Sequence, residues 1–234
     1  CNSRQSVMAR IGKASLLAAL LVAGAGASTS VYDIEVDDLE TGLPVGLSYY
    51  RGQVLLVVNV ASQCGYTEFT YSKLNALHDQ YAAKGLRILA FPCNQFGAQE
   101  PGTPEDILAF AHDKKKAAFD LFRKVDVDGP NAHPLFKWLL GTGGDCSDDD
   151  ASCPSWADAG ECGKNEAFMQ STCRLSCKVC QAPEGTGAPI RWNFESFLLT
   201  RSGALHKRWA TGTDLTAAEQ TKEIEQLLAA KDEV

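Results

Sequence analysis

Two apolar runs separated by a helical pattern set the strongest limit on the folds open to this chain. The first run, residues 54–60, is short and almost continuously aliphatic, which is typical of a strand buried on both faces. Residues 67–84 then carry apolar side chains at helical spacing, and Gly85 is placed to end that helix. A second apolar run at residues 86–91 predicts a second buried strand.

The segments farther along the chain extend this pattern. Thr103, followed by a proline and two acidic residues, predicts the start of another helix. Residues 194–200 and 204–209 predict the two strands of a hairpin, and Thr216 with Glu219 predicts a capping box for a last helix. This order of elements predicts an α/β fold, in which a mixed sheet has helices on both faces. A hydrophobic content of 45% is enough for the core of such a fold.

Cys64 lies at the predicted turn between the first apolar run and the first helix. A thiolate in that position is close to free backbone N–H groups and to the positive end of the helix dipole, so it can act as a nucleophile at neutral pH. The alternative is a buried structural residue, because free cysteines are among the most buried residue types. Taken alone, Cys64 favours the structural alternative, and other stretches of the chain change that balance.

Two polar segments are expected near Cys64 at one edge of the sheet. Residues 91–102 are apolar at their start, polar afterwards and punctuated by Gly and Pro, so they predict a loop that presents Gln99 beyond the second strand. Trp192 and Asn193 open the predicted hairpin. In an open α/β sheet the reactive crevice lies beyond the carboxyl ends of the strands, and loops that enter strands can also reach it. Amide and indole N–H groups there are suitable donors for a departing oxygen.

Together these segments resemble the glutathione peroxidase family. The resemblance extends over residues 31–143 and 190–228, and it implies a domain with a thioredoxin-like fold over residues 31–143 and 184–230. In that family a peroxidatic cysteine or selenocysteine is assisted by Gln, Trp and Asn side chains. The matching positions in this sequence are Cys64, Gln99, Trp192 and Asn193.

The resemblance also implies a reaction. The Cys64 thiolate would attack hydrogen peroxide or an organic or lipid hydroperoxide, and it would become a sulfenic acid. The family implies no prosthetic cofactor and no metal, because a thiol co-substrate restores the cysteine. An enzyme of this kind serves in the response to oxidative stress.

The sequence leaves the reducing thiol open. Thioredoxin-dependent relatives carry a resolving cysteine after a Phe-Ala pair, but here Phe110-Ala111 is followed by His112. One route is direct reduction by glutathione or by a thioredoxin-like or disulfide-isomerase-like dithiol protein. The other route is resolution by Cys93, although we favour the interpretation of Cys93 as a packed thiol behind the site.

A cysteine-rich segment interrupts the peroxidase pattern. It holds six of the nine cysteines, and an even set at this density predicts a disulfide framework. Zinc binding by Cys173, Cys177 and Cys180 is the alternative, which an oxidising compartment disfavours. Spacing alone leaves the pairing of the six open. The six are Cys146, Cys153, Cys162, Cys173, Cys177 and Cys180.

This segment, residues 145–181, resembles the ShK-toxin-like (ShKT) domain over its whole length. The connectivity of that family implies the pairs Cys146–Cys180, Cys153–Cys173 and Cys162–Cys177. The Lys and Tyr that block channels in the toxins correspond to Ala167 and Phe168 here, so we predict no channel blockade and leave the ligand of the module open. Because tetrameric relatives carry an oligomerisation loop in this region, the insert predicts a monomer.

Both ends of the sequence carry signals that predict where in or outside the cell the protein is located. Arg10 and Lys13 precede an apolar stretch and small residues, which predicts a signal peptide over residues 1–27; a membrane anchor or a plastid-type targeting element is the alternative. Residues 231–234 resemble the endoplasmic-reticulum retrieval sequence except for the final Val, so secretion and retention in the lumen are both expected alternatives. The formal net charge of −7 disfavours nucleic acid or an anionic membrane surface as the main partner.

Two classes of function remain open. The first is a cysteine-dependent peroxidase in the secretory pathway or outside the cell. The second is a secreted interaction protein or redox sensor, in which the ShKT module binds a partner and the peroxidase scaffold turns over little substrate. The presence of all four site residues favours the enzyme, because a protein without turnover has no need to keep them.

Overall fold

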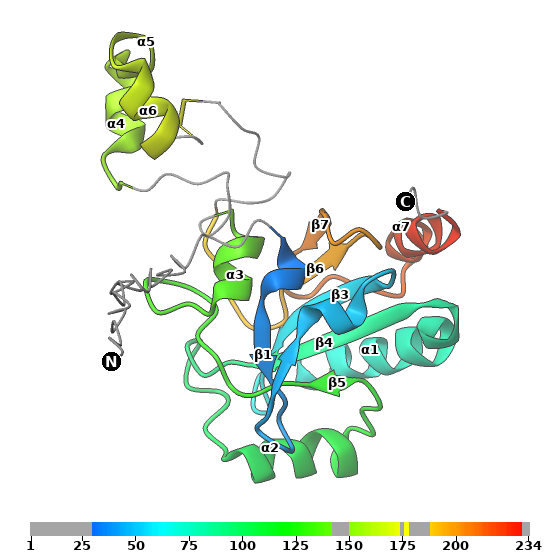
Figure 1. The fold of residues 1–234 in the computed structure, drawn as a ribbon. Helices are drawn as coiled ribbons and strands as arrows, with labels where there is room; N and C mark the ends of the chain where they lie inside the picture. Colours follow the sequence, from blue (N-terminus) through cyan, green and yellow to red (C-terminus); the bar gives the residue numbers. More distant parts are fainter. Residues whose placement is uncertain (1–29, 142–149, 174–175, 178–187, 231–234) are drawn as a thin grey trace, which may run out of the picture.

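The computed structural model describes residues 30–141, 150–173, 176–177 and 188–230 (Figure 1). Its centre is a five-stranded sheet with the strand order β5-β4-β3-β6-β7. The strands are β3 (Val54–Val60), β4 (Leu86–Pro92), β5 (Asp120–Leu121), β6 (Ser196–Leu199) and β7 (Leu205–Trp209). Because β3, β4 and β5 are parallel and β6 and β7 are antiparallel to their neighbours, the sheet is mixed and the fold is thioredoxin-like.

The register of the two central strands positions the site. Every residue of β3 is buried, and Val60 pairs with Pro92, so β3 and β4 end side by side. Strand β6 runs antiparallel to β3, with Ser196 opposite Val58. The chain that enters β6 therefore arrives at the edge where β3 and β4 end, and this is the edge at which the sequence predicts the reactive residues.

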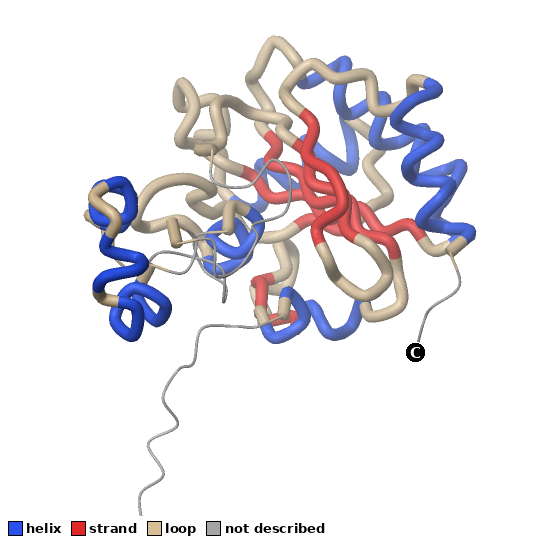
Figure 2. Tube along the Cα trace, turned by 90° about the horizontal axis from the view of Figure 1, so that it is seen from above, coloured by secondary structure: helices blue, strands red, loops and turns tan. Residues whose placement is uncertain are grey.

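Helices cover both faces of the sheet (Figure 2). Helix α1 (Thr67–Tyr81) continues through a 3-10 turn (Ala82–Lys84) and ends at Gly85, whose φ of 102° favours glycine. Helix α1 and helix α7 (Ala218–Ala229) contribute to the core on one face. Helix α3 (Pro134–Leu139) contributes to the core on the other face. The buried strands thus supply side chains to two separate cores.

The predicted start of helix α2 (Pro104–Ala109) is confirmed. The Thr103 hydroxyl accepts the Asp106 N–H at 3.3 Å, and the Asp106 carboxylate accepts the Thr103 N–H at 3.1 Å, which completes a capping box. The helix then widens into a π-helix, η4 (Phe110–Lys114). Phe110, at the start of this π-helix, lines a hollow together with Glu100 from the loop that follows β4.

The predicted capping box of the last helix is wrong. Helix α7 begins at Ala218, and no side chain caps its first turn. The Thr216 hydroxyl instead donates to Asp214 at 2.7 Å and accepts from Lys73 Nζ at 3.1 Å. The Thr216 hydroxyl is therefore bonded to Lys73 of α1 and to Asp214, and it does not cap the helix as the sequence predicts.

An amino-terminal hairpin precedes the sheet and was not expected from the sequence. Its strands are β1 (Glu35–Asp37) and β2 (Pro44–Gly46), and it is flanked by 3-10 turns η1 (Val31–Asp33) and η2 (Leu47–Tyr50). Elements of three or four residues carry too little periodicity for a sequence pattern to reveal them. Their buried residues join the core on the α3 face.

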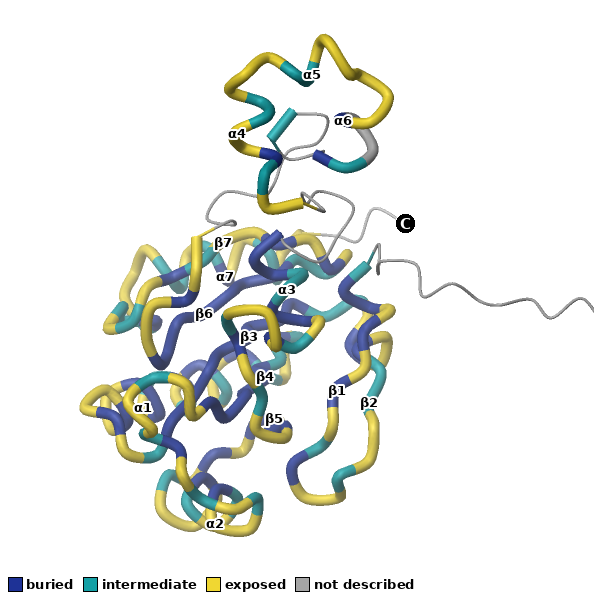
Figure 3. Tube along the Cα trace, turned by 90° about the vertical axis from the view of Figure 1, so that its left-hand side faces the viewer, coloured by how far each residue is buried: buried dark blue, intermediate teal, exposed yellow. Residues whose placement is uncertain are grey.

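The cysteine-rich segment folds into three short helices, α4 (Cys153–Asp158), α5 (Glu161–Lys164) and α6 (Glu166–Thr172). Disulfides join Cys153 to Cys173 and Cys162 to Cys177, which are two of the pairs that the resemblance implies. Most of its described residues are exposed, in contrast to the buried strands of the sheet (Figure 3). The third implied pair, Cys146–Cys180, the signal peptide and the final tetrapeptide lie outside the described residues.

The disulfides also bear on the zinc alternative. Cys173 and Cys177 are bonded to other cysteines, so neither thiolate is free for a metal ion. Within the described ranges no group of three His, Cys, Asp or Glu side chains is arranged to hold a metal. None of the helices in those ranges is long and apolar enough to cross a bilayer.

Candidate active site

Cys64 lies directly beyond β3, in the turn that leads into α1, and it is only 8% exposed. Thr67, the first residue of α1, holds this turn. Its hydroxyl donates to the Ala61 carbonyl at 2.7 Å and accepts the Cys64 N–H at 3.1 Å. The backbone of Cys64 is thereby fixed at the amino end of a helix of 15 residues, where the first N–H groups of the helix have no partner within the helix.

Gln99 and Asn193 come together from loops that are 94 positions apart in the sequence. Asn193 Nδ2 donates to Gln99 Oε1 at 2.9 Å and lies 3.5 Å from the Phe96 carbonyl. Asn193 is fully buried, whereas Gln99 is partly exposed. Because the Gln99 side-chain oxygen accepts this bond, its amide N–H groups are the part that remains to face a substrate.

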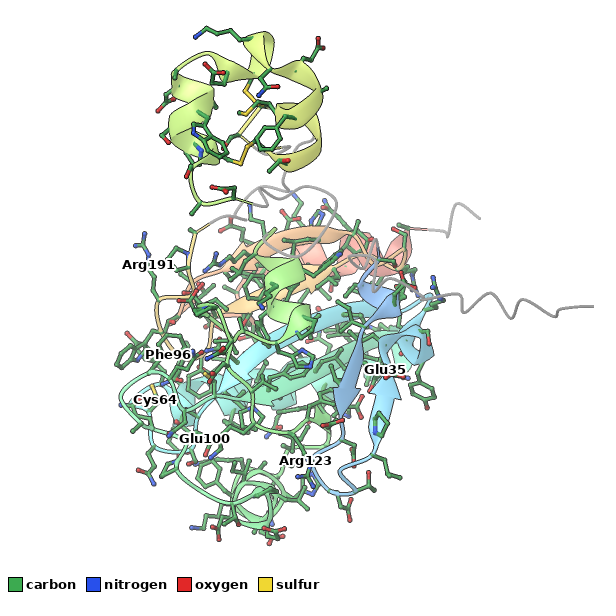
Figure 4. All side chains as sticks on the ribbon, turned by 60° about the vertical axis from the view of Figure 1, so that its left-hand side comes forward. Glu35, Cys64, Phe96, Glu100, Arg123 and Arg191 are labelled. Atoms are coloured by element: carbon green, nitrogen blue, oxygen red, sulfur yellow. A yellow bond between two sulfur atoms is a disulfide. The ribbon has the colours of Figure 1, made fainter. Side chains whose placement is uncertain are left out.

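The loop that carries Gln99 is bonded to the turn that carries Cys64. The Gln63 N–H donates to the Gln99 carbonyl at 3.0 Å. The Glu100 N–H donates to the Asn94 side chain at 2.9 Å and folds the loop back on itself. Cys64, Phe96 and Glu100 accordingly lie on one side of the molecule in Figure 4.

Trp192 packs against the same loop and is 38% exposed. A methyl group added at Gly97 would lie 3.5 Å from the indole and 3.5 Å from the Gln99 side chain. Both side chains therefore lie beside Gly97, whose φ of 65° favours glycine at this turn. From within β3, Asn59 Nδ2 donates to the Trp192 carbonyl at 3.1 Å.

Two residues with left-handed backbones flank the amide pair. Ala98 has a φ of 51° and precedes Gln99, and Phe194 has a φ of 68° and follows Asn193. Such conformations are costly for residues with a Cβ and are concentrated at functional sites. Each of the two residues is adjacent to one partner of the Gln99–Asn193 bond. The backbone strain is therefore located at the positions that orient the Gln99 and Asn193 side chains.

Two family models match separate parts of the chain. One described as glutathione peroxidase matches residues 31–140, and one described as ShK domain-like matches residues 145–180. A probable phospholipid hydroperoxide glutathione peroxidase from Citrus sinensis is 41% identical over 200 residues, which cover 86% of this chain and 95% of that protein. This chain belongs to the glutathione peroxidase family.

Further relatives and solved structures agree with this assignment. A probable phospholipid hydroperoxide glutathione peroxidase from Mesembryanthemum crystallinum is 40% identical over 199 residues, covering 85% of this chain and 92% of that protein. The crystal structure of T. cruzi GPX1 is similar with a TM-score of 0.55 and 30% identity, covering 85% of this chain and 96% of that one. Trgpx in its apo form gives a TM-score of 0.54 at 27% identity, covering 86% and 97%.

Among the described residues of this glutathione peroxidase, the second free cysteine faces the opposite core. Cys93 directly follows β4, is fully buried and packs with Phe91 in the core on the α3 face, whereas Cys64 belongs to the core on the α1 face. The Cys93 thiol donates to Gln95 Oε1 at 3.6 Å. Burial raises the pKa of Cys93, which disfavours its thiolate. This placement is that of a packed structural thiol.

Three residues that support the site were missed by the sequence analysis. Thr67 has a signal, because a threonine at a helix start can bond to the preceding turn. Asn59 also has one, because a lone amide within an apolar strand must find buried partners, here the Trp192 carbonyl. Glu100 gives no comparable signal, since an acid in a polar loop is usually exposed, yet it is only 1% exposed.

Proposed function

We propose that this glutathione peroxidase reduces hydroperoxides through Cys64. The thiolate attacks one oxygen of the O–O bond, so an S–O bond forms and the O–O bond breaks. The cysteine becomes a sulfenic acid, and the other oxygen leaves with a proton as water or an alcohol. The observation that carries this proposal is the Gln99–Asn193 hydrogen bond at the sheet edge where the Cys64 turn begins.

The departing oxygen needs hydrogen-bond donors, since negative charge develops on it as the O–O bond breaks. The Gln99 amide is oriented by Asn193, and the Trp192 indole N–H is a second donor on the same edge. Neither group changes its own protonation in this step. Their role is to hold the peroxide and stabilise the leaving oxygen.

Reduction of the sulfenic acid then requires a thiol from another molecule. The position after Phe110-Ala111 is His112, and Cys93 packs in the opposite core, so neither offers a nearby resolving thiol. A first thiol displaces the sulfenic oxygen as water and forms a mixed disulfide, and a second thiol releases Cys64. Glutathione and a thioredoxin-like or disulfide-isomerase-like protein are the co-substrates that we propose.

The rim of the site favours an apolar hydroperoxide. Tyr66, Phe69 and Trp192 are 43%, 37% and 38% exposed, and all three lie on the segments that carry the site. Exposed aromatic side chains are typical of surfaces that meet apolar ligands. The relatives from Citrus sinensis and Mesembryanthemum crystallinum are named for phospholipid hydroperoxides, and we extend that substrate class to this chain.

We place this activity in the secretory pathway or outside the cell, in the response to oxidative stress. The disulfides Cys153–Cys173 and Cys162–Cys177 support that placement, because such bonds persist in oxidising compartments. The ShKT module would tether the enzyme to a surface where peroxide is made. Deletion of residues 145–181 is then expected to leave turnover intact and to abolish localisation, and unchanged localisation would reject the tether.

A peroxide-consumption assay tests the proposed reaction. Purified wild type and Cys64→Ser are compared on hydrogen peroxide and on a phosphatidylcholine hydroperoxide, each with glutathione, thioredoxin or a disulfide isomerase as donor. We expect turnover by wild type with at least one donor and none by Cys64→Ser. Absence of turnover with every donor would contradict the proposal and leave the interaction-protein hypothesis in its place.

A further inference from the structure

A hollow of about 490 Å³ lies beside the turn that carries Cys64. Ser62 and Gln63, which precede Cys64 in that turn, form part of its wall. Helix α2 and the π-helix η4 form the facing wall with Ile107, Ala109 and Phe110. Gln99, Trp192 and Asn193 do not line it, so the hollow is a second approach to the same turn, separate from the donors that hold the peroxide.

The hollow contains a buried acid that makes no well-formed hydrogen bond. Glu100 lines it and is 1% exposed, and neither of its carboxyl oxygens has a partner at hydrogen-bond distance and angle within the described part of the chain. Burial raises the pKa of Glu100, an effect that weak hydrogen bonding from Ser62 and the charge of Lys124 partly oppose. Buried polar groups are normally hydrogen-bonded, so an unpartnered carboxyl at the wall of a cavity indicates that a ligand supplies donors there.

The two kinds of wall define the ligand. The Glu100 oxygens accept hydrogen bonds, which suits backbone or amide N–H groups, while Ile107 and Phe110 offer apolar surface. Asp106 and Lys114 also line the hollow and add one charge of each sign, which suits a peptide that carries both. Cys64 is not part of the wall, but the hollow reaches the residue directly before it. A molecule held here would keep its peptide groups in the hollow and extend a reactive group past Gln63 toward the sulfur.

We propose that this hollow binds the peptide that flanks the reducing thiol. The inference rests on the proposed function, because it assigns the place where the second half of that reaction begins. The bound thiolate attacks the Cys64 sulfenic sulfur, an S–S bond forms, the S–O bond breaks, and the oxygen leaves with the thiol's proton as water. Glutathione and a peptide segment of a dithiol protein share this chemistry of a cysteine thiol flanked by amide N–H groups.

Filling the hollow tests the proposal. Ala109 is exposed and lines the hollow, and Ala218 is exposed in the first turn of α7, so Ala109→Trp and Ala218→Trp form a matched pair. Each protein is assayed in two halves: the rate of Cys64 sulfenic acid formation with hydrogen peroxide, and the rate at which the oxidised protein reacts with a thiol. The thiols are glutathione, reduced thioredoxin and 2-mercaptoethanol, which has no peptide groups.

We expect Ala109→Trp to slow reduction by at least one peptide thiol by at least about tenfold while changing the 2-mercaptoethanol rate by less than about twofold. An effect on glutathione alone identifies the tripeptide as the ligand, and an effect on thioredoxin alone identifies a protein segment. Ala218→Trp should change neither half. A second variant, Glu100→Gln, should raise the KM for the same peptide thiol by about threefold or more without a comparable change for 2-mercaptoethanol.

Two results would overturn the inference. In the first, both peptide thiols react with Ala109→Trp at nearly the wild-type rate. In the second, 2-mercaptoethanol is slowed as strongly as the peptide thiols, which would mean that tryptophan merely obstructs the sulfur. Failure of the proposed function has a different signature, because wild-type Cys64 would then form no sulfenic acid with peroxide.

Discussion

Asn193 Nδ2 donates a 2.9 Å hydrogen bond to the side-chain oxygen of Gln99. The donor is fully buried and its own carbonyl accepts the Thr211 hydroxyl at 2.7 Å, so Asn193 has little freedom to move. The bond therefore holds the Gln99 side chain, on the loop after β4, against a rigid segment that leads into β6. Gln99 and Asn193 are best regarded as one unit that presents an amide N–H.

The first prediction concerns that unit. Gln99→Ala removes the donor, and Asn193→Ala leaves the donor unoriented, so each should slow oxidation of Cys64 by hydrogen peroxide by about 10- to 100-fold. Because both changes disable one unit, their effects should not add. The double variant should therefore oxidise Cys64 much faster than the rate obtained by multiplying the two single losses. Stopped-flow rates of sulfenic acid formation measure all three.

Gln95→Ala is the matched control for this cycle. Gln95 is another loop glutamine, but its side chain bonds to the Val127 N–H at 2.7 Å and to the Asp128 carbonyl at 2.8 Å, away from the amide pair. Its removal should lower stability without a comparable loss of peroxide rate. Simple additivity of Gln99→Ala and Asn193→Ala would show that the two side chains act independently.

A second prediction concerns Cys93. Because Cys64 and Cys93 pack in cores on opposite faces of the sheet, peroxide-treated wild type should contain no Cys64–Cys93 disulfide in its peptide mass spectrum. Cys93→Ala should keep turnover with an external thiol within about twofold and should lose about 1 kcal/mol of stability from the smaller buried side chain. Loss of turnover in Cys93→Ala, with a Cys64–Cys93 disulfide in wild type, would instead assign resolution to Cys93.

The central fold was predictable because each element carries its own local signal. The continuous apolar run of β3 and the capping box at Thr103 need no information from elsewhere in the chain, and both were predicted correctly. Thr216 shows the limit of such signals. Its hydroxyl is taken by Asp214 and by Lys73 on α1, a partner 143 positions away that no local pattern reveals.

The sequence supplies candidate members of the site but not their geometry. Cys64, Gln99, Trp192 and Asn193 became candidates through a resemblance that joins three distant segments. Their arrangement depends on backbone conformations that the sequence does not announce, such as the left-handed φ of Phe194. Burial of Glu100 was also unpredictable, because its neighbours around the hollow, such as Ile107 and Phe110, come together with it only in the folded chain.

The third prediction uses the buried acid. Burial raises the pKa of Glu100 above its ordinary value of 4.5, so the folded protein keeps a proton that the unfolded chain has already lost. Stability from this group therefore falls as the pH rises from about 4.5 through the folded pKa. The buried Tyr71 hydroxyl faces Glu100 but stays protonated, since its own pKa is raised. Urea denaturation should show the stability of Glu100→Gln relative to wild type increasing between pH 4.5 and pH 8.

Glu105 provides a control of opposite sign. Hydrogen bonds from its own backbone N–H and from Thr103, at the start of α2, lower the pKa of Glu105. Its contribution to stability is present above the unfolded pKa and is lost as the pH falls through the folded value. Glu105→Gln should therefore lose stability relative to wild type at neutral pH, and that difference should disappear in acid. Parallel pH profiles for the two variants would contradict the burial of Glu100.

The fourth prediction concerns a buried ion pair beside the site. Glu195 accepts from Arg208 Nη2 at 2.6 Å and from the Arg191 N–H at 2.7 Å, and the side chains of the pair are only 6% and 10% exposed. Arg208 also donates to the carbonyls of Ala188 and Pro189 at 2.6 and 3.0 Å. The pair therefore anchors residues 188–191, which lead directly into Trp192.

Arg208→Met should destabilise the protein by about 3 kcal/mol, because it leaves the Glu195 carboxylate buried without its ionic partner. The variant should also slow oxidation of Cys64, since the chain leading to Trp192 loses its anchor. Glu195→Gln should cost less, because Arg208 keeps its two carbonyl acceptors. Adding Glu195→Gln to Arg208→Met should restore part of the lost stability, because no unpaired charge then remains buried.

Arg201→Met separates positioning from general destabilisation. Arg201 also donates to backbone carbonyls, those of Gly52 and Leu228, but it lies where β3 begins and α7 ends, at the other end of the sheet from Cys64. Its loss should lower the urea midpoint and leave the rate of Cys64 oxidation within about twofold of wild type under folding conditions. If Arg201→Met and Arg208→Met slow that rate equally, the buried pair contributes to stability alone. If only Arg208→Met slows the oxidation of Cys64, then the bonds that anchor residues 188–191 are needed to position Trp192.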